Sequence, residues 1–141
     1  LPQASYDFIL TARSIHGWMG TPGMLEKTFR EFHDALKPGG ILAVEQHRAN
    51  PGPQDPEAAS GYVTEAYVIE QAEKAGFKLA GRSEINANAK DTKDHPFGVW
   101  TLPPALRSTA YGSKETDPSF DHSKYLSIGE SDRMTLRFVR P

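Results

Sequence analysis

The sequence predicts an α/β fold in which part of a doubly wound, Rossmann-like sheet is covered by helices. Segments of strand length and helix length alternate between residues 6 and 85, which is typical of parallel strands joined by right-handed crossovers. The first two strand-like segments are apolar without alternation, as in strands covered on both faces. The last, residues 133–139, alternates basic or polar with apolar residues, which favours one antiparallel strand added late.

The first strand is expected at residues 6–11, followed by a glycine-containing loop over residues 12–20. Thr21 is the expected N-cap of the next helix, and Pro22 its first residue. The sequence Lys-Pro-Gly-Gly at 37–40 should end this helix, since proline does not continue it. The apolar residues of its buried face recur at spacings of four, three and four: Leu25, Phe29, Phe32 and Leu36.

A second buried strand is predicted at residues 41–44, running out into polar residues 45–48. Prolines and glycines make residues 50–61 a loop. Thr64 should cap a second helix that ends near Gly76. Residues 77–85 then form a third strand with partial alternation.

The segment 86–132 is expected to be an irregular insertion within a single partial domain that spans residues 1–141. A connection this long is uncommon in a compact domain and is often functional. Residues 94–100, Asp-His-Pro-Phe-Gly-Val-Trp, form an aromatic patch within it. This patch is interpreted as a substrate lid or, alternatively, as a strap packed on the surface.

Composition excludes several classes of protein. The chain of 141 residues is 38% hydrophobic and 24% charged with a formal net charge of −2, as in ordinary globular proteins. No basic stripe predicts nucleic-acid binding, and no apolar run has the length of a membrane span. Cysteine is absent, which excludes thiolate chemistry and leaves the compartment open, with the cytoplasm favoured. No leader is visible at the start, and the first residue is not Met, so we expect a longer natural chain.

Three motifs carry a resemblance to a known family. Asp7 precedes an apolar strand, Leu-Lys-Pro-Gly-Gly-Ile-Leu at 36–42 joins a helix to a strand, and Ala-Gly-Phe at 75–77 does so again. In this order they resemble the carboxyl-terminal half of class I S-adenosylmethionine-dependent methyltransferases. Glu45 to Ala49 and Asp94 to Pro96 are similar to a group of bacterial predicted methyltransferases. The resemblance implies strands 4, 5, 6 and 7 of that fold, in the order 4-5-7-6 with the last antiparallel.

The sequence departs from this family in one respect, because it has no strand followed by G-x-G-x-G and an acidic residue. Without the family's first strand, Phe8 and its neighbours become an exposed apolar edge, which invites pairing with another chain. The expected partner is therefore a missing amino-terminal half or a second copy of this chain, besides a small-molecule acceptor. The cofactor that the resemblance implies is S-adenosylmethionine.

Candidate site residues follow the first two strands, because ligands of such sheets bind beyond the carboxyl ends of the strands. The resemblance implies that backbone at the end of the first strand approaches the cofactor, at Thr11, Ala12 and Arg13; the alternative is an ordinary strand exit. His16 and His47 are the candidate catalytic residues, since histidine exchanges protons near neutral pH. Alternatively, His16 is a loop residue packed on Trp18.

Four further side chains are candidates for holding substrate. Each has a structural alternative, such as core cover, a solvated surface charge or a turn former. A metal site built from His16, Glu45 and His47 was weighed but is not predicted, since no spacing requires it. The candidate substrate-binding residues are Trp18, Glu45, Arg48 and Asn86.

The predicted function is methyl transfer from S-adenosylmethionine to a small acceptor, with both halves of the fold present. One alternative is a non-catalytic binding or oligomerisation module that uses the exposed edge. Another is a different doubly wound enzyme, such as a dehydrogenase, since a fold does not fix function.

Overall fold

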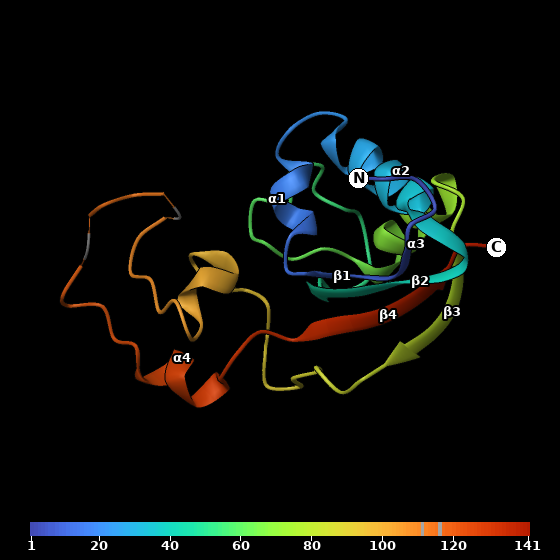
Figure 1. Ribbon diagram of the computed structural model, residues 1–141. Coiled ribbons are helices and arrows are strands. Elements are labelled where there is room, and N and C mark those ends of the chain that lie inside the picture. Colours follow the sequence, from blue (N-terminus) through green and yellow to red (C-terminus); the bar gives the residue numbers. More distant parts are fainter. Residues whose placement is uncertain (111, 116) are drawn as a thin grey trace.

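A single four-stranded sheet organises the chain, and three helices lie on one of its faces (Figure 1). The computed structural model describes residues 1–110, 112–115 and 117–141. The strands are β1 (Tyr6–Ala12), β2 (Leu36–His47), β3 (Lys78–Ser83) and β4 (Arg133–Val139). The helices on the sheet are α1 (Ile15–Met19), α2 (Met24–Ala35) and α3 (Glu65–Lys74).

The strand order is β1-β2-β4-β3, which confirms the predicted 4-5-7-6 order. β1 and β2 are parallel, with Ile9 opposite Leu42, as expected for strands joined by a crossover helix. β4 runs antiparallel to both of its neighbours, β2 and β3. The last strand along the chain therefore lies inside the sheet.

Alternate residues of β2 and β4 point toward the helices and form the core. Leu42, Val44, Leu136 and Phe138 are almost fully buried there. They pack with Phe29 of α2. Of the helical face predicted from the spacing, Leu25, Phe29 and Phe32 lie on α2, whereas Leu36 is the first residue of β2.

Two details of the helices differ from the prediction. Residues 15–19 form the short helix α1 rather than a loop, because a buried side chain from β2 binds its first N–H, as described below. α2 begins at Met24 with Gly23 as its N-cap, so the cap predicted at Thr21 is wrong. Gly23 has φ of 76°, a left-handed conformation that glycine adopts without strain. Thr64, in contrast, caps α3 as predicted: its hydroxyl accepts from the N–H of Tyr67 at 3.1 Å.

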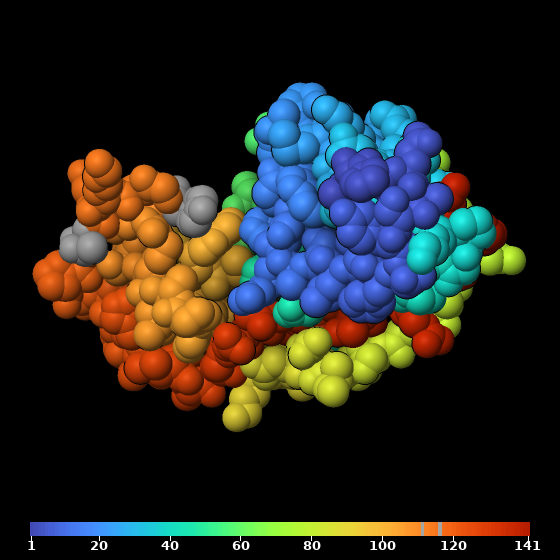
Figure 2. Space-filling view, in the orientation of Figure 1, coloured from blue at the N-terminus to red at the C-terminus, as the bar shows by residue number. Residues whose placement is uncertain are grey.

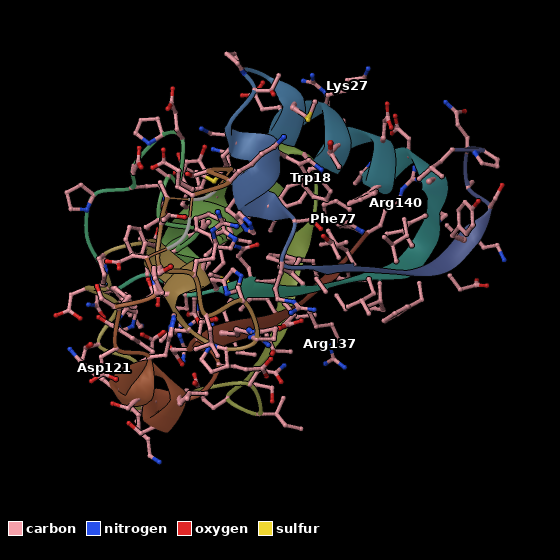
Figure 3. All side chains as sticks on the ribbon, turned by 90° about the vertical axis from the view of Figure 1, so that its left-hand side faces the viewer. Trp18, Lys27, Phe77, Asp121, Arg137 and Arg140 are labelled. Carbon is pink, nitrogen blue, oxygen red and sulfur yellow. The ribbon has the colours of Figure 1, made fainter. Side chains whose placement is uncertain are left out.

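The opposite face of the sheet and the free edge of β1 are not covered by helices. Phe8 and Leu10 of β1 are 57% and 61% exposed. Their neighbours on β2 across the pair, Ile41 and Ala43, lie on the same face. Figure 3 shows Arg137 on this face, on the other side of the sheet from Trp18 and Phe77. The exposed apolar edge predicted for the first strand is thus present.

The insertion over 86–132 forms a lobe beside the carboxyl ends of β1 and β2 (Figures 1 and 2). It is less irregular than expected, since it contains the 3-10 helix η1 (Gly98–Thr101) and the helix α4 (Ser123–Ile128). Two of its positions, 111 and 116, lie outside the described residues.

Candidate functional site

A pocket of about 320 Å³ lies where the carboxyl ends of β1 and β2 meet the inserted lobe. This is the edge at which open α/β sheets bind their ligands. Its volume is at the lower end of the range for small-molecule sites. The lining residues used below come from the strand ends, α1, the insertion and the start of β4: Arg13, His16, His47, Trp100, Ser131 and Arg133.

The chain leaves β1 through Ala12 and Arg13, which both line the pocket. Arg13 has φ of 53°, a left-handed conformation that costs energy for a residue with a Cβ. Its backbone N–H donates to the carbonyl of Glu45 at 2.7 Å, which holds this turn against β2. Strained backbone of this kind is concentrated at functional sites.

Glu45 lies between two arginines of the pocket. Its carboxylate is 3.4 Å from Nη1 of Arg133 and 4.0 Å from Nε of Arg13. Glu45 is not among the lining residues of the described chain. Its contacts are with these two arginines, and its role in binding substrate stays a prediction.

His16 stands in the first turn of α1 and is held by Gln46 from β2. The Nε2 of Gln46 lies 3.0 Å from Nδ1 of His16. Gln46 itself is fully buried, and its Oε1 accepts from the N–H of Ile15 at 3.1 Å. This bond binds the first N–H of α1, which explains why a helix begins here.

His47 ends β2 and is almost fully buried, with its ring centroid 5.3 Å from that of His16. Its Nδ1 is 2.5 Å from the Oγ of Ser131. Burial, followed by the positive charges of His16, Arg133 and Arg13, lowers the pKa of His47 to about 3. Burial also lowers the pKa of His16. Both imidazoles are therefore neutral at physiological pH.

The inserted lobe supplies the apolar wall of the pocket. The Trp100 ring meets the His16 ring edge to face, with centroids 5.8 Å apart. Val99, Leu102 and Pro103 complete this wall. The end of the predicted aromatic patch thus forms one side of the pocket, and its role as a lid stays a prediction.

Three of the predicted residues lie away from the pocket. Thr11 is buried, and its hydroxyl has no hydrogen-bond partner among the described residues. Trp18 packs edge to face on Phe32, with centroids 5.9 Å apart, and lines a separate cavity. Asn86 donates to the hydroxyl of Thr135 at 2.8 Å and so ties the insertion to β4.

Arg48 lines a second, larger groove of about 780 Å³ beside α3. All five of its N–H donors are used by three carboxylates. Burial opposes the charge of Asp132, yet bonds from Arg48 and Lys93 hold the pKa of that carboxyl at about 2. Arg48 is thus a structural ion-pair residue with no donor left for a substrate. The carboxylates that it binds belong to Glu65, Glu84 and Asp132.

Sequence reasoning missed Gln46, Ser131 and Arg133. The antiparallel pairing predicted for the last strand was the available signal, since it places Arg133 directly opposite His47. It also missed Asp91, which is buried and accepts from the hydroxyl of Tyr62 at 2.8 Å. Asp91 lies 2.7 Å from Nε2 of His95, so this cluster anchors the insertion beside the pocket.

Two absences apply to the described part of the chain. Its residues contain no group of three or more His, Asp or Glu side chains placed to hold a metal ion. None of its helices combines the length and apolar character that crossing a membrane requires.

No protein-family model matches the sequence, and a search of curated proteins gives no significant match. Solved structures do match. The cyclase SpnF has a TM-score of 0.55 at 14% identity, and the match covers 100% of this chain and 52% of SpnF. The 1,6-didemethyltoxoflavin-N1-methyltransferase of Burkholderia thailandensis, solved with S-adenosylhomocysteine, has a TM-score of 0.55 at 11% identity, covering 99% and 46%. A Haloferax volcanii complex that contains the methyltransferase activator Trm112 has a TM-score of 0.54 at 16% identity, covering 100% and 57%.

Because their sequence identities are low, these matches establish the fold alone. The chain has the topology of about half of a methyltransferase-type Rossmann-like fold, and it spans about half the length of the structures that it matches.

Proposed function

We propose that this chain is the carboxyl-terminal half of an S-adenosylmethionine-dependent methyltransferase and that its pocket holds a small methyl acceptor. The observation that carries the proposal is the position of this pocket, at the carboxyl ends of two parallel strands. When bound, S-adenosylmethionine supplies the activated methyl group. The task of this chain is then to align the acceptor and to exclude water.

The pocket residues fit only the part of S-adenosylmethionine that would approach the backbone at the end of β1. The backbone at Ala12 and Arg13 leaves β1 at the pocket. A glycine-rich loop and an acidic residue for the adenosine are not in the sequence. In the proposed whole protein these come from an amino-terminal half, which pairs with β1 and covers Phe8 and Leu10.

Neither His16 nor His47 is a strong base in the folded chain, because burial lowers the pKa of both. With a pKa of about 3, His47 holds a proton poorly at neutral pH, whereas an effective general base titrates near the working pH. The pocket therefore favours an acceptor that needs no proton removed before transfer. His16 and His47 then act on the acceptor by hydrogen bonding.

The first test is calorimetric titration of the 141-residue chain with S-adenosylmethionine. We expect no micromolar binding, because the part of the fold that grips adenosine is not in this sequence. A longer protein that includes the residues encoded upstream of Leu1 should bind the cofactor. Micromolar affinity of the chain alone, or upstream residues that form no G-x-G-x-G loop after a strand, would contradict the proposal.

A second candidate is a binding or oligomerisation module without catalysis, which the exposed apolar edge of β1 favours. The match to the [4+2]-cyclase SpnF illustrates that this topology is not tied to one reaction. A longer protein that oligomerises through β1 and binds no cofactor would favour this candidate.

A further inference from the structure

The side-chain amide of Gln46 has only one orientation that satisfies its neighbours. Its oxygen accepts from the N–H of Ile15 at 3.1 Å, and its nitrogen donates to the carbonyl of Gly61 at 3.1 Å. The reversed amide would place its NH₂ against the N–H of Ile15 and its oxygen against the carbonyl of Gly61. Both contacts would be repulsive inside a fully buried site. The second N–H of the amide therefore points at Nδ1 of His16.

This orientation determines the tautomer of His16. An Nδ1 that accepts from Gln46 carries no proton, so a neutral ring has its proton on Nε2. Among the described residues, Nε2 has no hydrogen-bond partner, and it is not one of the buried unpaired atoms. His16 thus presents an N–H donor in the pocket.

Arg13 adds a cationic donor at the same pocket. Its side chain is 45% exposed, and its ion pair is the 4.0 Å approach of Nε to Glu45. Its two terminal nitrogens have no partner among the described residues. Two donors, one of them charged, are what a carboxylate requires.

The side of the pocket that the insertion supplies is apolar, with Trp100, Leu102 and Pro103, while His47 and Arg133 make the strand side polar. The total volume of about 320 Å³ is small. A small, flat apolar body fits against the apolar wall.

We propose that the pocket binds a small planar carboxylic acid, whose carboxylate accepts from Nε2–H of His16 and the Arg13 guanidinium. Gln46 is then a positioning residue that keeps His16 a donor. Since this pocket is the acceptor site of the function proposed above, the assignment rests on that function for its meaning. Binding of the acid requires neither the cofactor nor methyl transfer.

The tautomer is tested first, by long-range proton–nitrogen NMR of the histidine side chains at pH 7. We expect His16 to have a protonated Nε2 and an unprotonated Nδ1. A protonated Nδ1 would overturn the role of Gln46. The spectrum of the unmodified chain suffices for this test, so no variant has to fold.

Ligand binding is tested by NMR titration with benzoate, with benzamide as the neutral probe of the same shape. Benzoate should shift the signals of His16 and Trp100 saturably, and benzamide should bind at least about tenfold more weakly. Arg13→Gln should weaken benzoate binding by about tenfold. Arg137→Gln, on the uncovered face of the sheet, is the matched control and should leave it unchanged (Figure 3).

The outcomes separate this proposal from the function proposed above. Equal binding of benzoate and benzamide, or an unaffected Arg13→Gln variant, overturns the carboxylate site even if the longer protein binds S-adenosylmethionine. Displacement of benzoate by free methionine, with tighter binding, would assign the pocket to the methionine part of the cofactor and overturn the acceptor assignment. Benzoate binding with no cofactor binding by the longer protein would keep the site and contradict the methyltransferase.

Discussion

Buried polar side chains dominate the residue scale of the site. Gln46 forms three hydrogen bonds: to the first N–H of α1, to the ring of His16 and to the carbonyl of Gly61. It does so from a fully buried position of β2 among apolar core residues. Removing such a residue leaves several buried groups unpaired, which costs more than the bonds themselves contribute. The local order of the pocket therefore depends on one amide.

The first residue-scale prediction concerns His47 and acid. Its pKa is about 3 when folded and about 6.5 when exposed, so between these values the unfolded chain binds more protons. The free energy of unfolding should therefore fall as pH falls from about 6 toward 3, by up to about 1.4 kcal/mol per pH unit from this residue. Urea unfolding of the wild type and of His47→Gln at pH 6.5, 5.5 and 4.5 measures the difference. Identical slopes in the two proteins would show that His47 does not titrate in this way.

Sequence reasoning found the location of the site but not the task of each residue in it. The pocket brings together residues at or just after the ends of two neighbouring strands: Ala12, Arg13, His16 and His47. Arg48 lies one residue beyond His47 and contacts a different groove. Which way a side chain turns at a strand end depends on distant carboxylates such as Asp132, and a linear pattern does not contain that information.

At the scale of elements, the existence of the strands was predicted best, because apolar runs between turn residues are direct signals of burial. β4 has the predicted bounds of 133–139, and β1 differs from its prediction by one residue. β2 extends over Leu36–His47 and not 41–44, so the residues predicted as a turn at 37–40 belong to the strand. α1 was missed because its five residues depend on Gln46, a residue that lies 31 positions from Ile15. Local propensity does not contain such a contact.

The prediction at this scale concerns the two threonine or serine residues that precede helices. Thr64→Ala should lower the free energy of unfolding by about 1 kcal/mol, because the cap bond to the N–H of Tyr67 is lost. Ser14→Ala is the matched control, since Ser14 precedes α1 without capping it. Its hydroxyl donates to the carbonyl of Ala12 instead, at an exposed position. Chemical denaturation measures both variants, and an equal loss would contradict the assigned cap.

At the scale of the whole molecule, one face of the sheet is packed and the other is open. The strand order was predictable through the family resemblance that three sequence motifs carry. The position of the insertion was not, because its two ends are held together by a bond from the backbone N–H of Asp132 to the carboxylate of Asp91, 41 residues away. The open face agrees with a chain that spans about half of its structural matches.

The prediction at this scale concerns self-association. An open edge with exposed apolar residues should pair two copies of the isolated chain at high concentration. Leu10→Lys should reduce this association, while changing the stability of the monomer by less than about 0.5 kcal/mol, because Leu10 is 61% exposed. Leu126→Lys, at a 57% exposed position on α4, is the matched control. Sedimentation velocity of the three proteins measures the effect, and an equal reduction in both variants would argue against the β1 edge.

The interior location of β4 has a consequence for synthesis on the ribosome. β4 separates β2 from β3, although it is the last strand to be translated. Until it emerges, β2 has an unpaired side and the apolar side chains of Leu42 and Val44 lack the neighbours that bury them. A nascent chain in this condition is a target for chaperones and proteases. The native arrangement is therefore reached only after β4 has emerged and has paired with β2 and β3.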